Sequence, residues 1–94
     1  MNITNLKLVI LNVQCCTATK AVQLADLYTK GNKCAEGELI KLKTTIDKLN
    51  LLKEYYCSVT IGENTTILTE DNVDILARDI MHYCNICDCQ LISE

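Results

Sequence analysis

The residues of this chain best suited to chemistry lie near its C-terminal end, in the run His82-Tyr83-Cys84-Asn85-Ile86-Cys87-Asp88-Cys89. A Cys-x-x-Cys pair such as Cys84 and Cys87 can place two thiolates at adjacent corners of a zinc tetrahedron. Cys89 and His82 could complete the four ligands, and Cys57 could approach from elsewhere in the chain. However, structural zinc sites usually have a turn between paired cysteines and a second such pair, and this sequence has neither. Zinc is therefore a candidate cofactor, but we favour a chain without metal or other cofactor.

The same cysteine pair could act as a redox dithiol, which requires a thiol pKa lowered at a helix N-terminus. Here the pair lies towards the end of a predicted helix, where the helix dipole disfavours a thiolate. An odd count of seven cysteines also does not fit a secreted disulfide scaffold. We therefore expect reduced cysteines that act as small buried hydrophobic residues.

No arrangement of residues in the sequence indicates catalysis. His82 is the single histidine, and no nucleophile with an orienting carboxylate is spaced around it. The sequence has no glycine-rich phosphate loop, no Gly-x-Ser-x-Gly and no His-Glu-x-x-His. Tyr55 and Tyr56 could stack on bases, but their surroundings lack the basic charge of a single-strand groove. We expect no catalytic residues and no enzymatic activity.

Apolar residues at helical spacing predict the elements that carry these side chains. In residues 6–28 the apolar face is interrupted near Thr17, so this segment forms either one helix or two shorter ones. Gly31 is suited to the left-handed conformation that ends a helix. Absence of proline from the whole chain also favours helices.

Two further helices are predicted. Residues 35–56 have the strongest periodicity, with apolar residues alternately three and four positions apart, and Asn32 can cap this helix. The last helix begins at Thr69, whose hydroxyl can accept a hydrogen bond from the backbone of Asn72, and its apolar face continues to Cys87.

Residues 58–68 contain two β-branched runs on either side of Gly62, Glu63 and Asn64. This pattern predicts a short β-hairpin or an extended loop. The expected fold is therefore mainly α, a three-helix bundle-like single domain over residues 1–94 with this hairpin or loop inserted.

The aliphatic content predicts a protein partner. The 94 residues include thirteen leucines, ten isoleucines and five valines. A monomer of this size buries only about 60–65% of its unfolded surface, so we expect other subunits to cover part of this apolar surface. A tight monomeric bundle is the alternative to a homo-oligomer or larger assembly. The predicted contact residues are Leu6, Val9, Ile10, Val13, Val59, Ile61 and Ile67.

The charge pattern argues against a nucleic-acid partner, and the apolar pattern argues against a membrane partner. The net charge is −3, and residues 54–94 carry Arg78 against eight acidic residues, which gives −7. This balance does not fit a general nucleic-acid binder. No signal peptide pattern is found, and no apolar run of the length that a membrane helix requires. We therefore expect no membrane partner and a cytoplasmic location on synthesis.

Asn, Ile and Lys together make 26 of the 94 residues, and lysine outnumbers arginine eight to one, as AT-rich coding produces. With the compact helices predicted over 39–56 and 69–87, this composition resembles small helical structural proteins of tailed bacteriophages. The resemblance implies a place in the virion, at the head–tail junction or on the capsid. It assigns no functional residues.

Three function hypotheses follow from these observations. The first is a non-enzymatic structural subunit that assembles through apolar helical and loop contacts. The second is a small phage-type inhibitor or regulator that binds a host protein through the acidic C-terminal half. The third is a zinc-stabilised interaction module that uses the C-terminal cysteines and would unfold when the metal is removed.

Overall fold

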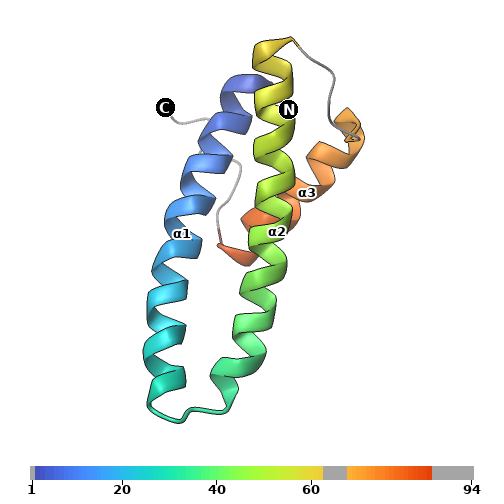
Figure 1. The fold of residues 1–94 in the computed structure, drawn as a ribbon. Helices are drawn as coiled ribbons and strands as arrows, with labels where there is room; N and C mark the ends of the chain where they lie inside the picture. Colours follow the sequence, from blue (N-terminus) through green and yellow to red (C-terminus); the bar gives the residue numbers. More distant parts are fainter. Residues whose placement is uncertain (1, 63–67, 86–94) are drawn as a thin grey trace.

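Three α-helices are found in residues 2–62 and 68–85, the parts of the chain that the computed structural model describes. They are α1 (Ile3–Thr29), α2 (Cys34–Ile61) and α3 (Glu70–Tyr83). Helices α1 and α2 form a long antiparallel hairpin, and α3 lies across one face of it (Figure 1). The prediction of a mainly α fold is confirmed, and these described ranges contain no strand.

The first segment forms one helix rather than two. The Asn2 side chain caps its start and accepts a hydrogen bond from the backbone N–H of Asn5 at 2.8 Å. At the predicted interruption of the apolar face, the Thr17 hydroxyl donates a hydrogen bond to the backbone carbonyl of Gln14 at 3.1 Å. Because the helix backbone satisfies this hydroxyl, the polar residue does not interrupt the helix. Gly31 follows the last turn with a φ of +82°, as predicted.

Helix α2 is longer than predicted and replaces part of the expected β-hairpin. Residues 58–61 continue the helix, and Gly62 ends it in the left-handed conformation with a φ of +83°. The Gly62 N–H donates to the carbonyl of Ser58 at 2.9 Å, so the glycine expected in a hairpin turn caps a helix instead. The hairpin prediction is therefore wrong for this part, while residues 63–67, including Ile67, lie outside the described residues.

Side chains also cap the other two helices at or next to the predicted positions. The Asn32 side chain accepts a hydrogen bond from the backbone N–H of Cys34 at 2.9 Å, although Lys33 occupies the cap position itself. The Thr69 hydroxyl accepts from the backbone N–H of Asn72 at 3.3 Å, and this prediction is confirmed.

Helix α3 ends earlier than the apolar pattern predicted. Its last residue is Tyr83, Cys84 is the C-cap, and Asn85 has a φ of +57°. A left-handed asparagine ends a helix in the way that glycine does. The continuation of the helix to Cys87 is therefore not observed, and Cys87 itself lies outside the described residues.

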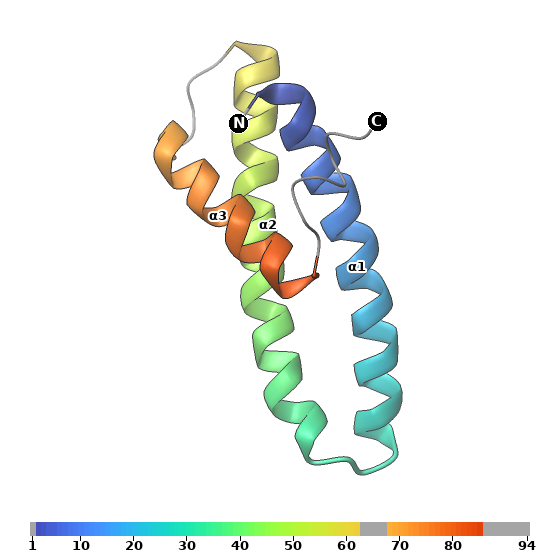
Figure 2. The ribbon, with the colours of Figure 1, turned by 180° about the vertical axis from the view of Figure 1, so that it is seen from behind.

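All three helices contribute to the hydrophobic core, which lies in the half of the hairpin nearest the N-terminus (Figure 2). Val9, Leu52 and Ile80, one from each helix, are each 0% exposed. The buried residues of this cluster are Leu6, Val9, Ile10, Val13, Leu49, Leu52, Val73, Ala77, Ile80 and Met81.

Four of the predicted partner contacts belong to this core and are not on the surface. They are Leu6, Val9, Ile10 and Val13, with exposures between 0% and 8%. Because α2 and α3 cover this face of α1, the side chains contact the rest of the chain and cannot reach a partner. The prediction is corrected accordingly. Val59 and Ile61 are accessible, at 48% and 69% exposure, in the last turn of α2.

The matched pair Leu51 and Leu52 tests this core. Leu52→Ala is expected to lower the free energy of unfolding by about 2–5 kcal/mol, because it leaves a cavity among three helices. Leu51 is 38% exposed, so Leu51→Ala is expected to cost less than about 1 kcal/mol. Urea unfolding followed by circular dichroism measures both values, and equal losses would contradict the observed packing.

Candidate functional site

The predicted zinc ligands do not form a cluster in the described part of the chain. His82 is exposed in the last turn of α3, and Cys84 is half-buried at its C-cap. Cys87 and Cys89 lie outside the described residues. Within the described ranges, no group of three or more His, Cys, Asp or Glu side chains could hold a metal ion.

Cys84 lies near a cysteine that is distant in the sequence, Cys16 on α1. Burial is the largest cause of the raised pKa of the Cys84 thiol, about 12, and the neighbouring Cys16 side chain raises this pKa as well. At neutral pH the Cys84 thiol is therefore protonated, and a protonated thiol is a poor nucleophile.

The other described cysteines do not all occupy buried positions. Cys16 and Cys84 are half-buried, which agrees in part with the expected role of small hydrophobic residues. Cys15, Cys34 and Cys57 are exposed, and for these three the expectation is wrong. Apolar character alone does not place a cysteine in the core when its helix directs it outwards.

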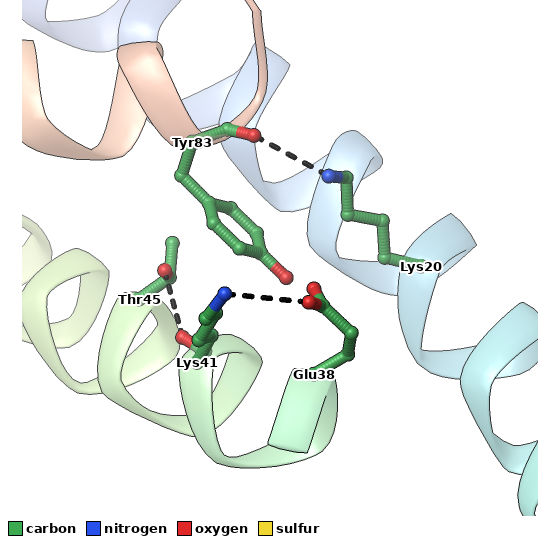
Figure 3. A network of polar contacts seen from close by, with 5 residues as sticks. All are labelled: Lys20, Glu38, Lys41, Thr45 and Tyr83. Carbon is green, nitrogen blue, oxygen red and sulfur yellow. Dashed lines mark hydrogen bonds and ion pairs between the residues drawn. The ribbon is translucent and has the colours of Figure 1, made fainter. Parts of the chain in front are cut away.

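Lys20 and Tyr83 join the middle of α1 to the end of α3 (Figure 3). The Lys20 ammonium donates to the backbone carbonyl of Tyr83 at 3.3 Å, and its nitrogen lies 4.2 Å from the centroid of the Tyr83 ring. A cation is favourable at the C-terminal end of a helix and over the face of an aromatic ring. This contact marks the boundary between the three-helix half and the two-helix half of the molecule.

The Tyr83 hydroxyl is buried between the helices and has no hydrogen-bond partner among the described groups. It lies near Glu38 and Lys41, which form an ion pair of 3.4 Å (Figure 3). Burial raises the pKa of Tyr83, and the negative charge of Glu38 raises it further. The side chain therefore stays neutral and fills space between α1 and α2.

The outward face of α1 carries an apolar surface that the sequence analysis missed. Five exposed residues four and three positions apart make up this outer stripe: Leu11, Cys15, Ala18, Val22 and Ala25. Leu11 is 51% exposed and Val22 is 72% exposed. Their alternating spacing is that of a coiled-coil seam and was visible in the sequence. It was missed because the core residues of α1 follow a second, equally regular apolar pattern.

The corresponding face of α2 is different. Its exposed residues at the same spacing include Ile40 and Leu51, but also Asp47 and Glu54. Charged residues on a helix face keep it solvated. The outer stripe of α1 contains no charged residue, so it differs from an ordinary exposed helix face.

Helix α1 is long and apolar enough to cross a membrane when judged by length and composition alone. An 18-residue window within Ile3–Thr29 has a mean hydropathy of 1.3, and 22% of this window is buried. The expectation that no segment reaches this level is therefore wrong. Core helices and N-terminal signal sequences pass the same test. In this fold the high hydropathy arises because α1 has one apolar face in the core and a second one outside.

The contact between Lys20 and Tyr83 can be tested by substitution. Lys20→Met keeps much of the side-chain volume but removes the hydrogen bond and the charge over the ring, and is expected to cost about 1 kcal/mol of stability. Lys43→Met, which changes an exposed lysine on α2, serves as the control and should leave stability nearly unchanged. Equal urea midpoints for the two variants would show that the contact contributes nothing.

The raised pKa of Cys84 predicts a loss of stability at alkaline pH. Between pH 9 and pH 12 the thiol keeps its proton in the folded chain, whereas the unfolded thiol, with its ordinary pKa of 9.0, loses it. The free energy of unfolding should therefore fall as the pH rises through this interval. Cys84→Ala should make this fall less steep, and Cys57→Ala, at an exposed site, should not. Parallel pH profiles for all three proteins would contradict this assignment.

Comparison of the chain with protein families, with curated proteins and with solved structures finds no match. The chain's own surfaces are therefore the basis for a proposed function. Two features are distinctive: the uncharged outer stripe of α1 and the contact between Cys16 and Cys84 on its inner side.

Proposed function

We propose that this chain is a non-enzymatic assembly subunit that binds other protein subunits through the outer stripe of α1. The observation that carries the proposal is the exposure of this uncharged stripe along a helix whose opposite face already fills the core. Single exposed apolar residues are common on folded proteins. An aligned series of them along one helix is typical of an interaction surface.

The composition of the outer stripe suits a partner helix. Leu11 and Val22 are large enough to insert between the side chains of a neighbouring helix. Cys15, Ala18 and Ala25 are small and allow two helix backbones to approach closely. The stripe carries no charge that would need a counter-charge on the partner, so a second copy of the chain can bind it without repulsion between like charges.

The end of the hairpin offers a second apolar contact. Val59 and Ile61 are exposed in the last turn of α2, and Ile3 is 39% exposed at the start of α1. The two helix ends lie beside each other (Figure 1). We include Val59 and Ile61 in the proposed contact surface, as residues that would extend an assembly beyond a pair.

The setting we propose for this assembly is a bacteriophage virion. The composition rich in Asn, Ile and Lys and the short helical chain support this proposal. A virion component should remain with purified particles through density-gradient centrifugation, and quantitative mass spectrometry of those particles should detect it at a constant ratio to the major capsid protein. A chain that stays entirely in the unassembled fraction would contradict this setting.

A charge placed in the outer stripe should disrupt the assembly. Size-exclusion chromatography with light scattering should give the wild type a mass that is a multiple of the 10.5 kDa chain. Val22→Lys should elute as a monomer, because a buried unpaired ammonium strongly opposes association. The matched control is Ile40→Lys, which introduces the same charge at a residue 66% exposed on α2 and should assemble as the wild type does. A monomeric wild type, or an assembled Val22→Lys variant, would refute the proposal.

A further inference from the structure

We propose that Cys16 and Cys84 are a site of reversible oxidation, at which a small-molecule disulfide such as oxidised glutathione converts the two thiols into an intrachain disulfide that links α1 to the end of α3. This inference is independent of the proposed assembly function. It concerns the inner side of α1, whereas the outer stripe faces away from α3.

A contact between Lys20 and Tyr83 lies beside the two cysteines. Lys20 lies one helical turn after Cys16 on α1, and Tyr83 directly precedes Cys84. The hydrogen bond of 3.3 Å between the Lys20 ammonium and the Tyr83 carbonyl therefore fixes these two turns side by side (Figure 3). This arrangement brings the half-buried Cys84 next to the half-buried Cys16. The two thiols are therefore neighbours in the fold although they are far apart in the sequence.

The position of Cys84 makes that approach possible. Cys84 is the C-cap of α3 and not an interior residue of the helix, and it is followed by Asn85 in the left-handed conformation. Helix ends move more easily than helix interiors, because fewer backbone hydrogen bonds hold them. The adjustment required by disulfide geometry can therefore be made at the end of α3 without distortion of α1.

The other described cysteines are exposed rather than half-buried. Cys15 is adjacent to Cys16, but successive residues of a helix point about 100° apart, so Cys15 faces outwards in the outer stripe. Cys34 and Cys57 lie towards opposite ends of α2, about 34 Å apart along the helix, so they cannot form a bond with each other.

The reaction is a two-step thiol–disulfide exchange. The Cys16 thiol gives its proton to solvent, and its sulfur attacks one sulfur of oxidised glutathione, so that a mixed disulfide forms on Cys16. The first glutathione thiolate leaves and takes up that proton. The Cys84 thiol then gives its proton to solvent, and its sulfur attacks the Cys16 sulfur of the mixed disulfide. The second glutathione thiolate leaves and takes up that proton. Two protein thiols lose two electrons in total, and one small disulfide is reduced to two thiols.

The order of the two steps follows from the surroundings of Cys84. Burial keeps its thiol protonated at neutral pH, so it is a poor first nucleophile. In the second step its target sulfur is on the neighbouring Cys16, and the nearby Lys20 ammonium favours the thiolate that must form.

The disulfide would stabilise the folded chain and leave its arrangement unchanged. It would close a loop of 84 − 16 = 68 residues that includes all of α2. A cross-link over a loop of this length restricts the unfolded chain and should raise the urea midpoint by about 1–2 M. In a reducing cytoplasm such bonds are transient, so the site would respond to oxidising conditions.

The test uses the wild-type full-length chain, incubated with oxidised glutathione and then alkylated with N-ethylmaleimide. Peptide mapping by mass spectrometry under non-reducing conditions should identify Cys16 linked to Cys84, and dithiothreitol should reverse the link. Alkylated Cys16 and Cys84 after oxidation, stable glutathione adducts at both, or a bond from either one to Cys87 or Cys89 would overturn the pairing.

Substitutions provide a second measurement. The oxidised wild type should unfold at a higher urea concentration than the reduced wild type, and Cys16→Ser and Cys84→Ser should each abolish this difference. The matched control is Cys34→Ser, which changes an exposed thiol at the start of α2, outside the outer stripe, and should retain the full difference. An oxidation-dependent shift that persists in Cys16→Ser would refute the proposal, and the peptide map of the wild type decides the matter should either variant fold poorly.

Discussion

The difference in length between the helices determines where this chain is well packed. Helix α3 has 14 residues, whereas α1 and α2 have 27 and 28. At 1.5 Å per residue, α3 can cover only about half of the hairpin that the other two form. The three-helix half contains the hydrophobic core, and the remaining half depends on contacts between α1 and α2 alone. Lys20 and Tyr83 lie at the boundary, where α3 ends against both longer helices.

Helix α1 shows why a regular apolar pattern can predict an element without predicting what the element contacts. The spacing of its apolar residues indicated a helix, and the helix is observed. Helix α1 has two sets of apolar residues with that spacing, one on each of two faces. The sequence does not show which of these two faces α2 and α3 cover. Leu6, Val9, Ile10 and Val13 were therefore assigned to a partner although they form the core, while the exposed set with Leu11 and Val22 was overlooked. Helices with one charged face, such as α2, do not have this ambiguity.

The boundaries of the elements depended on residues that fit more than one structure. Thr69 predicted the start of α3 correctly, because a hydroxyl followed by acidic residues has one common role at a helix start. The residues before Gly62 are β-branched and suit a strand, yet Ser58 is buried and the helix continues past it. A glycine can end a helix or occupy a hairpin turn, and only tertiary packing decides between these.

The cysteines illustrate the same limit of local spacing. The spacing of three residues between Cys84 and Cys87 predicts a possible metal or redox pair, but in the fold the packing of α3 on α1 places Cys84 near Cys16. No local pattern contains this information, since it depends on where α3 ends.

Cys15 and Cys16 also show that adjacent residues in one turn of α1 lie on two different surfaces. The first thiol is exposed in the outer stripe, and the second is half-buried on the side of α1 that faces α3. Because the two faces are separate, assembly and oxidation at α1 would be independent events rather than competing ones.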